Sequence, residues 1–500
     1  MSKPNLKDLL EHLNSSDIAF LGENISLSGL YLFAFTQKVL EKLEKRKLPA
    51  NSQIIIVSDN SFYLLGFLIA SWKLNLKPLI PNGMGQSSLE KAKNFAQVIL
   101  SDDEKVVALF KEQNKDVISF SGTDFESLTL KNSYSDFLEE LKILLENLTI
   151  THMTSGSTGT PKLITRTLAS FILEAKKVCV KLEELFLLNE KTIVAATVPL
   201  FYAYGIEFRF ILPLFKHLKF FMHMFKYEEQ LTILNNFDLR TLLISSPAFL
   251  KRLSLSNILK GETLVLTAGG AINEKIINNV KTSLSDNLFE IFGSTETGVM
   301  ACRKVESLHS HWTPPYGNSF YIVKEKINED SYSVISDGEG VLALDSDYVD
   351  DSLKKNAQNL FGDKIRLFIG EDMVKLSYGN LTLLGRVGRV LKLEDKRLSL
   401  DSLEGQMIGH PFIKEVALIS EKNSAIQYTK ALMVLTNEGK KVLSSLTKGK
   451  FIIKLRVTLK QYIDPIAIPR KMIFVEELPT TENGKIAYKE VSRILNNEIS

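Results

Sequence analysis

The chain has 500 residues, which exceeds what one hydrophobic core normally supports, so we expect at least two domains. Hydrophobic residues make up 45% and charged residues 24%, an ordinary balance for a globular protein in water, and no apolar run is long enough to span a bilayer. The net charge of +3 argues against a dedicated nucleic-acid-binding protein. Because Cys179 and Cys302 are the only cysteines, we expect no disulfide framework and a cytoplasmic location.

The N-terminal residues 1–13 have the pattern of an amphipathic helix and lack the apolar centre of a signal peptide. Apolar runs rich in β-formers then alternate with helical patterns, which predicts the α/β class. The expected strands are Ile54–Ser58, one beginning at Leu79, Leu148–Met153, Ile193–Val198, Thr241–Ser245 and Leu264–Ala268, and the expected helices are Ser61–Leu74 and Ser170–Phe186. Ligands of such sheets bind at the carboxyl ends of the strands.

The phenylalanine-rich stretch Phe215–Phe225 allows two interpretations. It could form a lipid-binding surface, but its nearly alternating pattern favours a half-buried strand.

The stretch most suggestive of a ligand site is TSGSTGTPK, residues 154–162. Its glycines allow backbone N–H groups to turn toward an anion, and its hydroxyls and lysine add donors and positive charge. The residues expected to cradle phosphate are Thr154, Ser155, Gly156, Ser157, Thr158, Gly159 and Lys162. The spacing of a Walker A loop is absent, and a stretch of this composition is also common in plain surface turns.

Three further segments follow in order, namely FGSTETG (Phe292–Gly298), LGRVGRVLK (Leu384–Lys392) and LPTTENGK (Leu478–Lys485). Together with TSGSTGTPK they resemble the signature motifs of the adenylate-forming (AMP-binding) superfamily, which includes acyl-CoA synthetases, aryl-acid ligases and the adenylation domains of peptide synthetases. The resemblance implies ATP- and Mg²⁺-dependent activation of a carboxylic acid as an acyl-adenylate, with release of pyrophosphate. Transfer to a phosphopantetheine thiol, of an acyl carrier protein or of coenzyme A, would follow.

The resemblance also implies roles for individual residues. Lys485 would be the catalytic lysine that bridges the acyl carboxylate and phosphate, Thr295 would contact the α-phosphate, and Glu296 would hold Mg²⁺. The nucleotide would further contact Phe292, Gly293, the loop Gly269, Gly270 and Ala271, and the ribose-binding Asp372 and Arg386. The acyl pocket would include Tyr202, Gly205 and Gly298.

After Gly385 the chain continues with about 115 residues of mixed β and α pattern, enough for a small domain. We therefore expect an AMP-binding adenylation domain over residues 1–385, built of α/β layers with mixed sheets, and a small mobile α+β domain over residues 386–500. Gly388 stands where the family usually has a charged hinge residue, and because glycine permits large dihedral changes at low steric cost, we still expect a hinge there.

The expected small domain is basic. From Val387 to Ser500 there are 19 Lys and Arg against 13 Asp and Glu, a net charge of +6. The cluster of Arg389, Lys392, Lys396 and Arg397 could attract an anionic thiol carrier, with a preference for a carrier protein over coenzyme A, or could be a solvated charged face.

Two positions besides Gly388 depart from the family's pattern. Tyr202 stands where the acyl-CoA branch has histidine and the amino-acid branch has aspartate, and a phenol cannot balance a buried ammonium, so an aryl or medium-size acyl carboxylate is favoured. Asp395 replaces a glycine beside the expected thiol path. The alternatives are an amino-acid-activating enzyme that loads a carrier protein and a non-catalytic nucleotide-binding relative. Lys162, Glu296 and Lys485 argue against the last.

Overall fold

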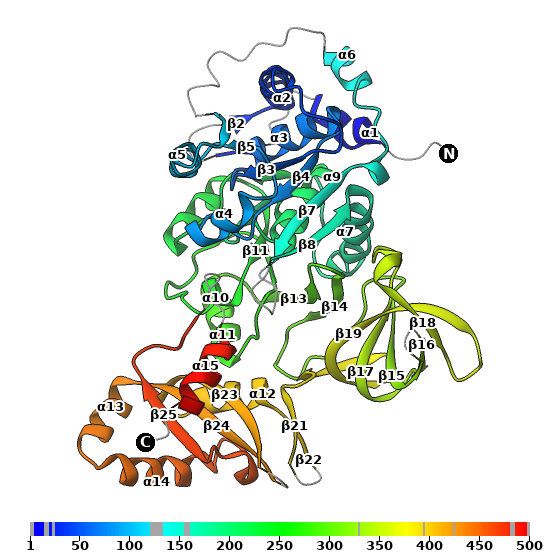
Figure 1. The fold of residues 1–500 in the computed structure, drawn as a ribbon. Coiled ribbons are helices and arrows are strands. Elements are labelled where there is room, and N and C mark those ends of the chain that lie inside the picture. Colours follow the sequence, from blue (N-terminus) through cyan, green and yellow to red (C-terminus); the bar gives the residue numbers. More distant parts are fainter. Residues whose placement is uncertain are drawn as a thin grey trace. The chain divides into compact units, whose positions relative to one another are not determined.

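The computed structural model describes residues 5–14, 20–22, 26–120, 134–154, 161–328, 331–393, 396–423, 426–480 and 486–497. The chain divides into two compact units, of residues 1–318 with 346–353 and of residues 319–345 with 354–500 (Figure 1). Within the described part, no helix combines the length and the apolar character that crossing a membrane requires. The domain boundary expected between residues 385 and 386 remains a prediction.

The first unit contains a six-stranded sheet whose strands are parallel except for the antiparallel pair β7 and β8. Its order is β6 (Asp116–Ser119), β5 (Val98–Ser101), β3 (Gln53–Val57), β4 (Lys77–Ile80), β7 (Thr149–Thr154) and β8 (Lys162–Thr167). Helix α3 (Ser61–Lys73) is buried from Ser61 to Trp72, as expected for a helix that is apolar on all sides. It begins at the capping side chain of Asn60 and packs against α2 (Gly29–Glu44).

An eight-stranded sheet completes the first unit. Its order is β14 (Gly298–Lys304), β13 (Asn287–Ser294), β12 (Thr263–Thr267), β11 (Arg240–Ser245), β9 (Thr192–Ala196), β10 (Lys219–Phe221), β1 (Phe20–Leu21) and β2 (Ser26–Leu27). Strands β13 to β1 run parallel, whereas the outer strands β14 and β2 are antiparallel to their neighbours. The carboxyl ends of β13, β12, β11 and β9 therefore meet at one edge.

The other helical segments of the first unit connect and cover these sheets. They are α1 (Leu6–Leu10), η1 (Glu11–Asn14), α4 (Gln86–Ala92), α5 (Glu104–Glu112), α6 (Tyr134–Glu139), η3 (Leu145–Asn147), α7 (Leu168–Glu183), α8 (Ala203–Gly205), η4 (Ile206–Ile211), α9 (Leu212–Phe215), η5 (Glu228–Asn236), α10 (Pro247–Leu250), α11 (Glu274–Ser283) and η6 (Asp351–Leu353). Helix α7 lies beside β8 and β14 (Figure 1). Of the amphipathic helix expected over residues 1–13, α1 covers Leu6–Leu10, and residues 1–4 lie outside the described part. Apart from the Phe215–Phe225 stretch, the other strands and helices expected up to Ala268 are confirmed to within a few residues.

The expected half-buried strand over Phe215–Phe225 is wrong in its extent. Phe215 ends helix α9, and only Lys219–Phe221 form a strand. Because β10 lies inside the sheet between β9 and β1, the successive residues Phe220 and Phe221 are both buried, one on each face.

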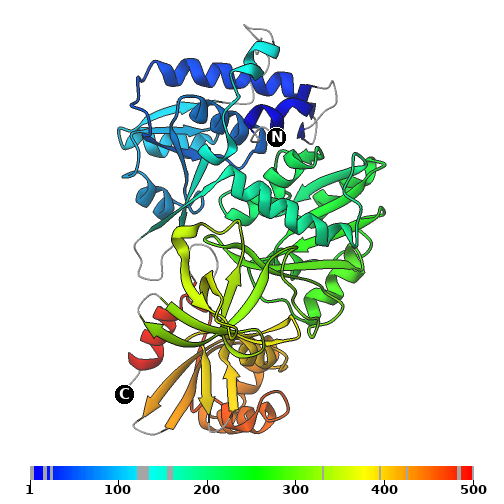
Figure 2. The ribbon, with the colours of Figure 1, turned by 90° about the vertical axis from the view of Figure 1, so that its right-hand side faces the viewer.

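The second unit begins with a six-stranded sheet. Its order is β17 (Gly338–Asp345), β15 (Ser319–Asn328), β16 (Ser331–Ile335), β18 (Lys354–Gln358), β19 (Lys364–Ser377) and β20 (Asn380–Arg386). Strand β17 also pairs with β19, so the sheet closes on itself around a small core. Figure 2 shows these curved strands in yellow.

The C-terminal part of the second unit contains a hairpin and a three-stranded sheet with helices on both faces (Figure 1). The elements are β21 (Val390–Leu393), β22 (Lys396–Ser399), α12 (Leu400–Ile408), β23 (Ile413–Asn423), β24 (Ile426–Leu435), α13 (Asn437–Ser444), α14 (Lys448–Leu459), η7 (Pro465–Ala467), β25 (Lys471–Val475) and α15 (Tyr488–Asn497). Along β24, Ala431 and Met433 pack with α12 and α14, while Leu432 and Val434 pack with α15. This alternation is the period of two that a strand imposes.

Candidate active site

Three of the expected site segments leave parallel strands at the same edge of the eight-stranded sheet. FGSTETG begins at the end of β13, the Gly269–Ala271 loop follows β12, and Phe201–Gly205 follows β9. Only β11 lies between β12 and β9. Segments far apart in sequence therefore meet at the carboxyl edge of one sheet, which is where ligands of α/β sheets bind.

The FGSTETG segment is a tight hairpin between β13 and β14. Ser294 is paired with Gly298, and Ser294 and Thr297 exchange hydrogen bonds of 3.2 Å from each backbone N–H to the other's hydroxyl. A Cβ on Gly293 would lie 2.1 Å from the carbonyl oxygen of Gly298, so only glycine permits this approach. These bonds place Thr295 and Glu296 at the tip.

An ion pair connects this tip to the TSGSTGTPK segment. Lys162 Nζ lies 2.9 Å from Glu296 Oε1, with the lysine side chain 58% exposed. Burial by itself would raise the pKa of Glu296, but the hydrogen bond from Lys162 and a backbone hydrogen bond outweigh it and lower the pKa. Glu296 is therefore ionised at neutral pH.

The expected phosphate cradle connects the antiparallel strands β7 and β8. Thr154 is paired with Lys162, and the Thr154 hydroxyl donates to the Lys162 carbonyl at 3.2 Å. The intervening Ser155, Gly156, Ser157, Thr158 and Gly159 lie outside the described residues. The strand feeding the segment is thus confirmed, whereas the cradle itself stays a prediction.

Phe292, the aromatic residue expected against adenine, packs against a second aromatic ring. Phe292 meets Trp312 edge to face, with ring centroids 6.0 Å apart, and the Arg303 guanidinium lies 4.4 Å from the Trp312 ring centroid. On the neighbouring strand end, Gly269 has a φ of +88°, a backbone conformation that glycine adopts without strain. The roles assigned to Phe292, Gly270 and Ala271 remain predictions.

The tyrosines of the FYAYG segment differ in their surroundings. Tyr202 is 36% exposed, whereas the Tyr204 hydroxyl donates to the Leu266 carbonyl at 2.8 Å, and burial raises its pKa well above the usual value. Tyr204 thus links this segment to the end of β12, a connection that sequence reasoning missed. Gly205 lies so close to Pro199 that a Cβ would meet the Pro199 carbonyl oxygen at 2.0 Å.

Two buried acids near these segments were also missed. Glu174 of α7 forms an ion pair with Arg166 of β8, with a distance of 2.6 Å between Oε2 and Nη2. Burial, followed by the charge of Glu174, raises the pKa of Glu207 on the π-helical segment η4 well above its usual value. The positive charge of Arg166 opposes these effects, so Glu207 interacts electrostatically with both members of the Arg166–Glu174 pair.

The second unit holds the expected ribose-binding pair. Asp372 and Arg386 are register partners on β19 and β20, and Asp372 Oδ1 lies 3.8 Å from Arg386 Nε. Burial raises the pKa of Asp372 despite the opposing effect of Arg386. Gly388 follows in a turn with a φ of +88°, closed by the Arg389 N–H donating to the Arg386 carbonyl at 2.8 Å.

Lys485 and Asp395 lie outside the described residues. A bridge between Thr480 and Ile486 flanks the segment that contains Lys485. The catalytic role of this lysine and the hinge role of Gly388 therefore remain predictions.

Arg389 does not belong to a free basic patch, which corrects the sequence-based expectation. Its guanidinium bonds to Asp401 at 2.7 Å and to Glu404 at 2.9 Å, and it lies 3.8 Å from the ring centroid of Tyr488. The backbone register sets Lys392 opposite Arg397, so these two positions are cross-strand neighbours.

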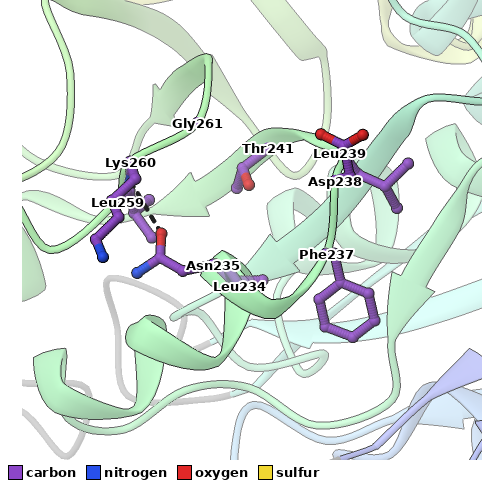
Figure 3. A pocket seen from close by; sticks show the side chains of 9 residues that line it. All are labelled: Leu234, Asn235, Phe237, Asp238, Leu239, Thr241, Leu259, Lys260 and Gly261. Atoms are coloured by element: carbon purple, nitrogen blue, oxygen red, sulfur yellow. Dashed lines mark hydrogen bonds between the residues drawn. The ribbon is translucent and has the colours of Figure 1, made fainter.

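A pocket of about 230 Å³ lies at the opposite edge of the eight-stranded sheet, near the start of β11 (Figure 3). Asn235 on its wall accepts the Lys260 N–H at 2.9 Å and donates to the Ile258 carbonyl at 2.8 Å. These polar atoms hold the local fold together, and the pocket lies away from all three motif segments.

Comparison with known proteins identifies the family. The profile of AMP-binding enzymes matches residues 51–342, more than half of the chain, and that of the AMP-binding enzyme C-terminal domain matches residues 402–485. The chain therefore belongs to the family of AMP-binding enzymes.

Curated relatives match over a shorter stretch. The D-alanine–D-alanyl carrier protein ligase of Staphylococcus aureus (strain Newman) is 29% identical over 164 residues, which cover 32% of this chain and 33% of the ligase. The matched stretch thus spans about a third of the length of these relatives.

Solved structures share the fold along nearly the whole chain. An anthranilate CoA ligase in complex with anthranoyl-AMP has a TM-score of 0.74 at 15% identity, covering 99% of this chain and 97% of that one. The o-succinylbenzoate CoA synthetase of Bacillus subtilis in complex with ATP and magnesium has a TM-score of 0.76 at 16% identity, covering 98% and 100%. These likenesses confirm the expected fold class, with a large N-terminal and a smaller C-terminal domain.

Proposed function

We propose that this protein uses ATP to activate a carboxylic acid as an acyl-adenylate, releases pyrophosphate, and passes the acyl group to a phosphopantetheine thiol. The observation that carries the proposal is the Lys162–Glu296 contact of 2.9 Å, because it brings the expected phosphate segment and the expected magnesium ligand together. Family membership and the gathering of three motif segments at one sheet edge support it.

The chemistry requires that two anions approach each other, the substrate carboxylate and the α-phosphate. Two unit charges 4 Å apart repel by roughly 4 kcal/mol at an effective dielectric constant of 20. Lys162 and Lys485 would offset this repulsion, and the Thr295 hydroxyl would orient the phosphate. No protein nucleophile is needed, because the substrate carboxylate attacks.

The residues present fit a magnesium ion that arrives with the nucleotide. Among the described residues no group of three or more His, Cys, Asp or Glu side chains could hold a metal by itself. Glu296 is an ionised oxygen ligand at a hairpin tip, and Mg²⁺ usually binds through one or two carboxylates together with substrate phosphates. When bound, the ion would neutralise phosphate charge.

For the acid, we favour an aryl or medium-size acyl carboxylate. The phenol of Tyr202 offers no negative charge to an ammonium group, and Tyr204 is already bonded to the sheet. The second candidate is an amino acid, because the curated relatives are named as ligases of D-alanine.

The acceptor is either a carrier protein or coenzyme A. The name of the curated relatives favours a carrier protein, and the basic C-terminal region, with Lys392 opposite Arg397, is compatible with an anionic partner. Arg389 does not add to this argument, because its guanidinium bonds to Asp401 and Glu404.

The test is pyrophosphate exchange with aryl acids, medium-chain fatty acids, and D- and L-alanine. We expect exchange with one class, and a loss of orders of magnitude in Lys485→Ala, since each 1.36 kcal/mol of lost transition-state stabilisation is about tenfold. Lys489→Ala is the matched control, because Lys489 is an exposed lysine in α15, four residues further on. ATP binding without exchange for any acid would support the non-catalytic alternative.

The acceptor is tested by offering coenzyme A or phosphopantetheinylated carrier protein at two salt concentrations. Salt-sensitive acylation of the carrier protein is expected. Efficient ligation of coenzyme A without any acylation of carrier protein would contradict this preference.

A further inference from the structure

Arg166 and Glu174 form a buried ion pair to which the sequence assigned no role. Arg166 lies on β8, and its guanidinium covers the ring of Phe171 at 4.2 Å from the centroid. Glu174 lies on α7, and its Oε2 accepts a hydrogen bond of 2.6 Å from Arg166 Nη2. The two side chains are only 5% and 2% exposed, so neither is free to contact solvent or ligand.

The second carboxylate oxygen of Glu174 holds the FGSTETG hairpin. Glu174 Oε1 accepts the N–H of Val299 at 2.7 Å. The register of β13 and β14 shifts between Phe292 and Gly293, so this side chain provides a hydrogen bond to Val299 beside an irregular part of the ladder. The Val299 carbonyl accepts from the Tyr348 hydroxyl. Both backbone groups of Val299 are therefore held by side chains from outside β13 and β14.

Gly298 makes this contact sterically possible. It has a φ of +66°, and a Cβ at this position would lie 2.2 Å from Glu174 Oε2. The carboxylate thus occupies the space that a side chain would need. Glu174 consequently touches the residue that closes the hairpin as well as the one that follows.

The Arg166–Glu174 pair and the Lys162–Glu296 pair connect the same two parts of the chain. Lys162 and Arg166 are both on β8, four residues apart and hence on one face of the strand, while Glu296 and Val299 belong to the hairpin and its return strand. In the outer pair the Lys162 side chain is 58% exposed and the Glu296 side chain 25%, and the two groups would contact phosphate and Mg²⁺ under the proposed function. Once ligand engages these groups, the inner pair would still connect β8 to the hairpin.

We propose that Arg166 and Glu174 are positioning residues, which hold the Thr295–Glu296 tip at a fixed distance from β8 so that Lys162 and Glu296 can bind Mg²⁺ and ATP together. This inference rests on the proposed function. It concerns geometry, since neither side chain reaches the surface.

The decisive variant is Glu174→Gln. A glutamine has nearly the same shape but one acceptor oxygen, so it can accept from Arg166 or from Val299 and not from both. The matched control is Glu290→Gln, because Glu290 forms a second buried pair, with Arg303, between β13 and β14 at 2.7 Å and with exposures of 6% and 9%. Its bonds to Arg303 do not involve Val299.

Three measurements are made on the full-length protein, namely calorimetric affinity for ATP with Mg²⁺, thermal unfolding, and amide hydrogen exchange of residues 294–299. We expect similar losses of thermal stability in both variants. Only Glu174→Gln should lower the affinity for ATP with Mg²⁺, by about tenfold, the effect of 1.4 kcal/mol, and only this variant should exchange the Val299 amide faster.

Equal affinity of folded Glu174→Gln and wild-type protein would overturn the inference, and so would an equal loss of affinity in Glu290→Gln. Failure of the wild-type protein to bind ATP with Mg²⁺ would instead overturn the proposed function. In that case the exchange of residues 294–299 would still decide whether Glu174 fixes the hairpin. Arg166→Lys, which keeps the charge, should restore part of the affinity lost in Arg166→Ala, and no such difference would count against an ionic role.

Discussion

Gly298→Ala tests how closely the buried carboxylate and the motif hairpin pack. The variant forces an alanine to adopt a φ of +66° and places its Cβ 2.2 Å from Glu174 Oε2, well inside any normal contact. The neighbouring carboxylate cannot move freely, because Arg166 Nη2 holds it at 2.6 Å and the Val299 N–H at 2.7 Å. The substitution should therefore strain the backbone and the packing together.

The size of the effect is the sum of these two costs. A left-handed conformation costs an alanine about 1 to 2 kcal/mol relative to glycine, and inserting a methyl group into a packed interior typically costs about 1 to 3 kcal/mol. We expect Gly298→Ala to reduce the free energy of unfolding by about 2 to 5 kcal/mol. Gly379→Ala is the matched control, because Gly379 has a φ of +77° and nothing within 4 Å of the added Cβ.

Urea denaturation of both alanine variants measures the costs separately. The control should lose about 1 to 2 kcal/mol, the backbone cost alone. In a Glu174→Ala background, adding Gly298→Ala should also cost only this amount, since the obstructing carboxylate is gone. If Gly298→Ala is no more destabilising than Gly379→Ala, or costs the same with and without Glu174, the reasoning about this contact is wrong.

Three further predictions follow from other groups. Burial raises the pKa of Asp102 to about 6, so the folded state keeps a proton that the unfolded chain releases near the ordinary aspartate pKa of 3.8. Stability should therefore fall as pH rises between these values, and Asp102→Asn should stabilise the protein by about 3 kcal/mol at pH 7.5 but hardly at pH 3 in urea denaturation. Glu296→Gln should change stability by less than about 1 kcal/mol, because its partner Lys162 is exposed, yet lower pyrophosphate exchange by about 100-fold or more; a large loss of stability with normal exchange would argue for a structural role. Gly388→Pro cannot keep the φ of +88° and should impair thioester formation more than adenylation; equal losses in the two half-reactions would argue against a hinge at this position.

The strands and helices of the first unit could be predicted because their patterns are local. The apolar runs at Ile54–Val57 and Leu264–Leu266 and the all-apolar helix Ser61–Trp72 correspond to segments that the structure buries. The failure at Phe215–Phe225 has a physical reason. Alternation indicates a strand with one wet face, whereas β10 lies inside a sheet that is covered on both sides.

The sequence by itself determined the motifs and their family, because TSGSTGTPK and FGSTETG carry their chemistry in contiguous residues. The resemblance also assigned Asp372 and Arg386 to one site, and the structure pairs these two residues across β19 and β20. Such residues can be found from the sequence because they lie at set distances from a motif along the chain.

Only the tertiary structure decided which side chains contact the motif segments and hold them in place. Tyr202 and Tyr204 are two residues apart, and the path of α8 and η4 determines that Tyr204 bonds to β12. The sequence placed Arg389 in a basic patch, whereas in the structure its guanidinium bonds to Asp401 and Glu404. Glu174 bonds to both Arg166 and Val299 because α7 packs beside both β8 and β14. A hydrogen bond acts over about 3 Å regardless of separation along the chain, so such partners are determined by the packing of whole elements.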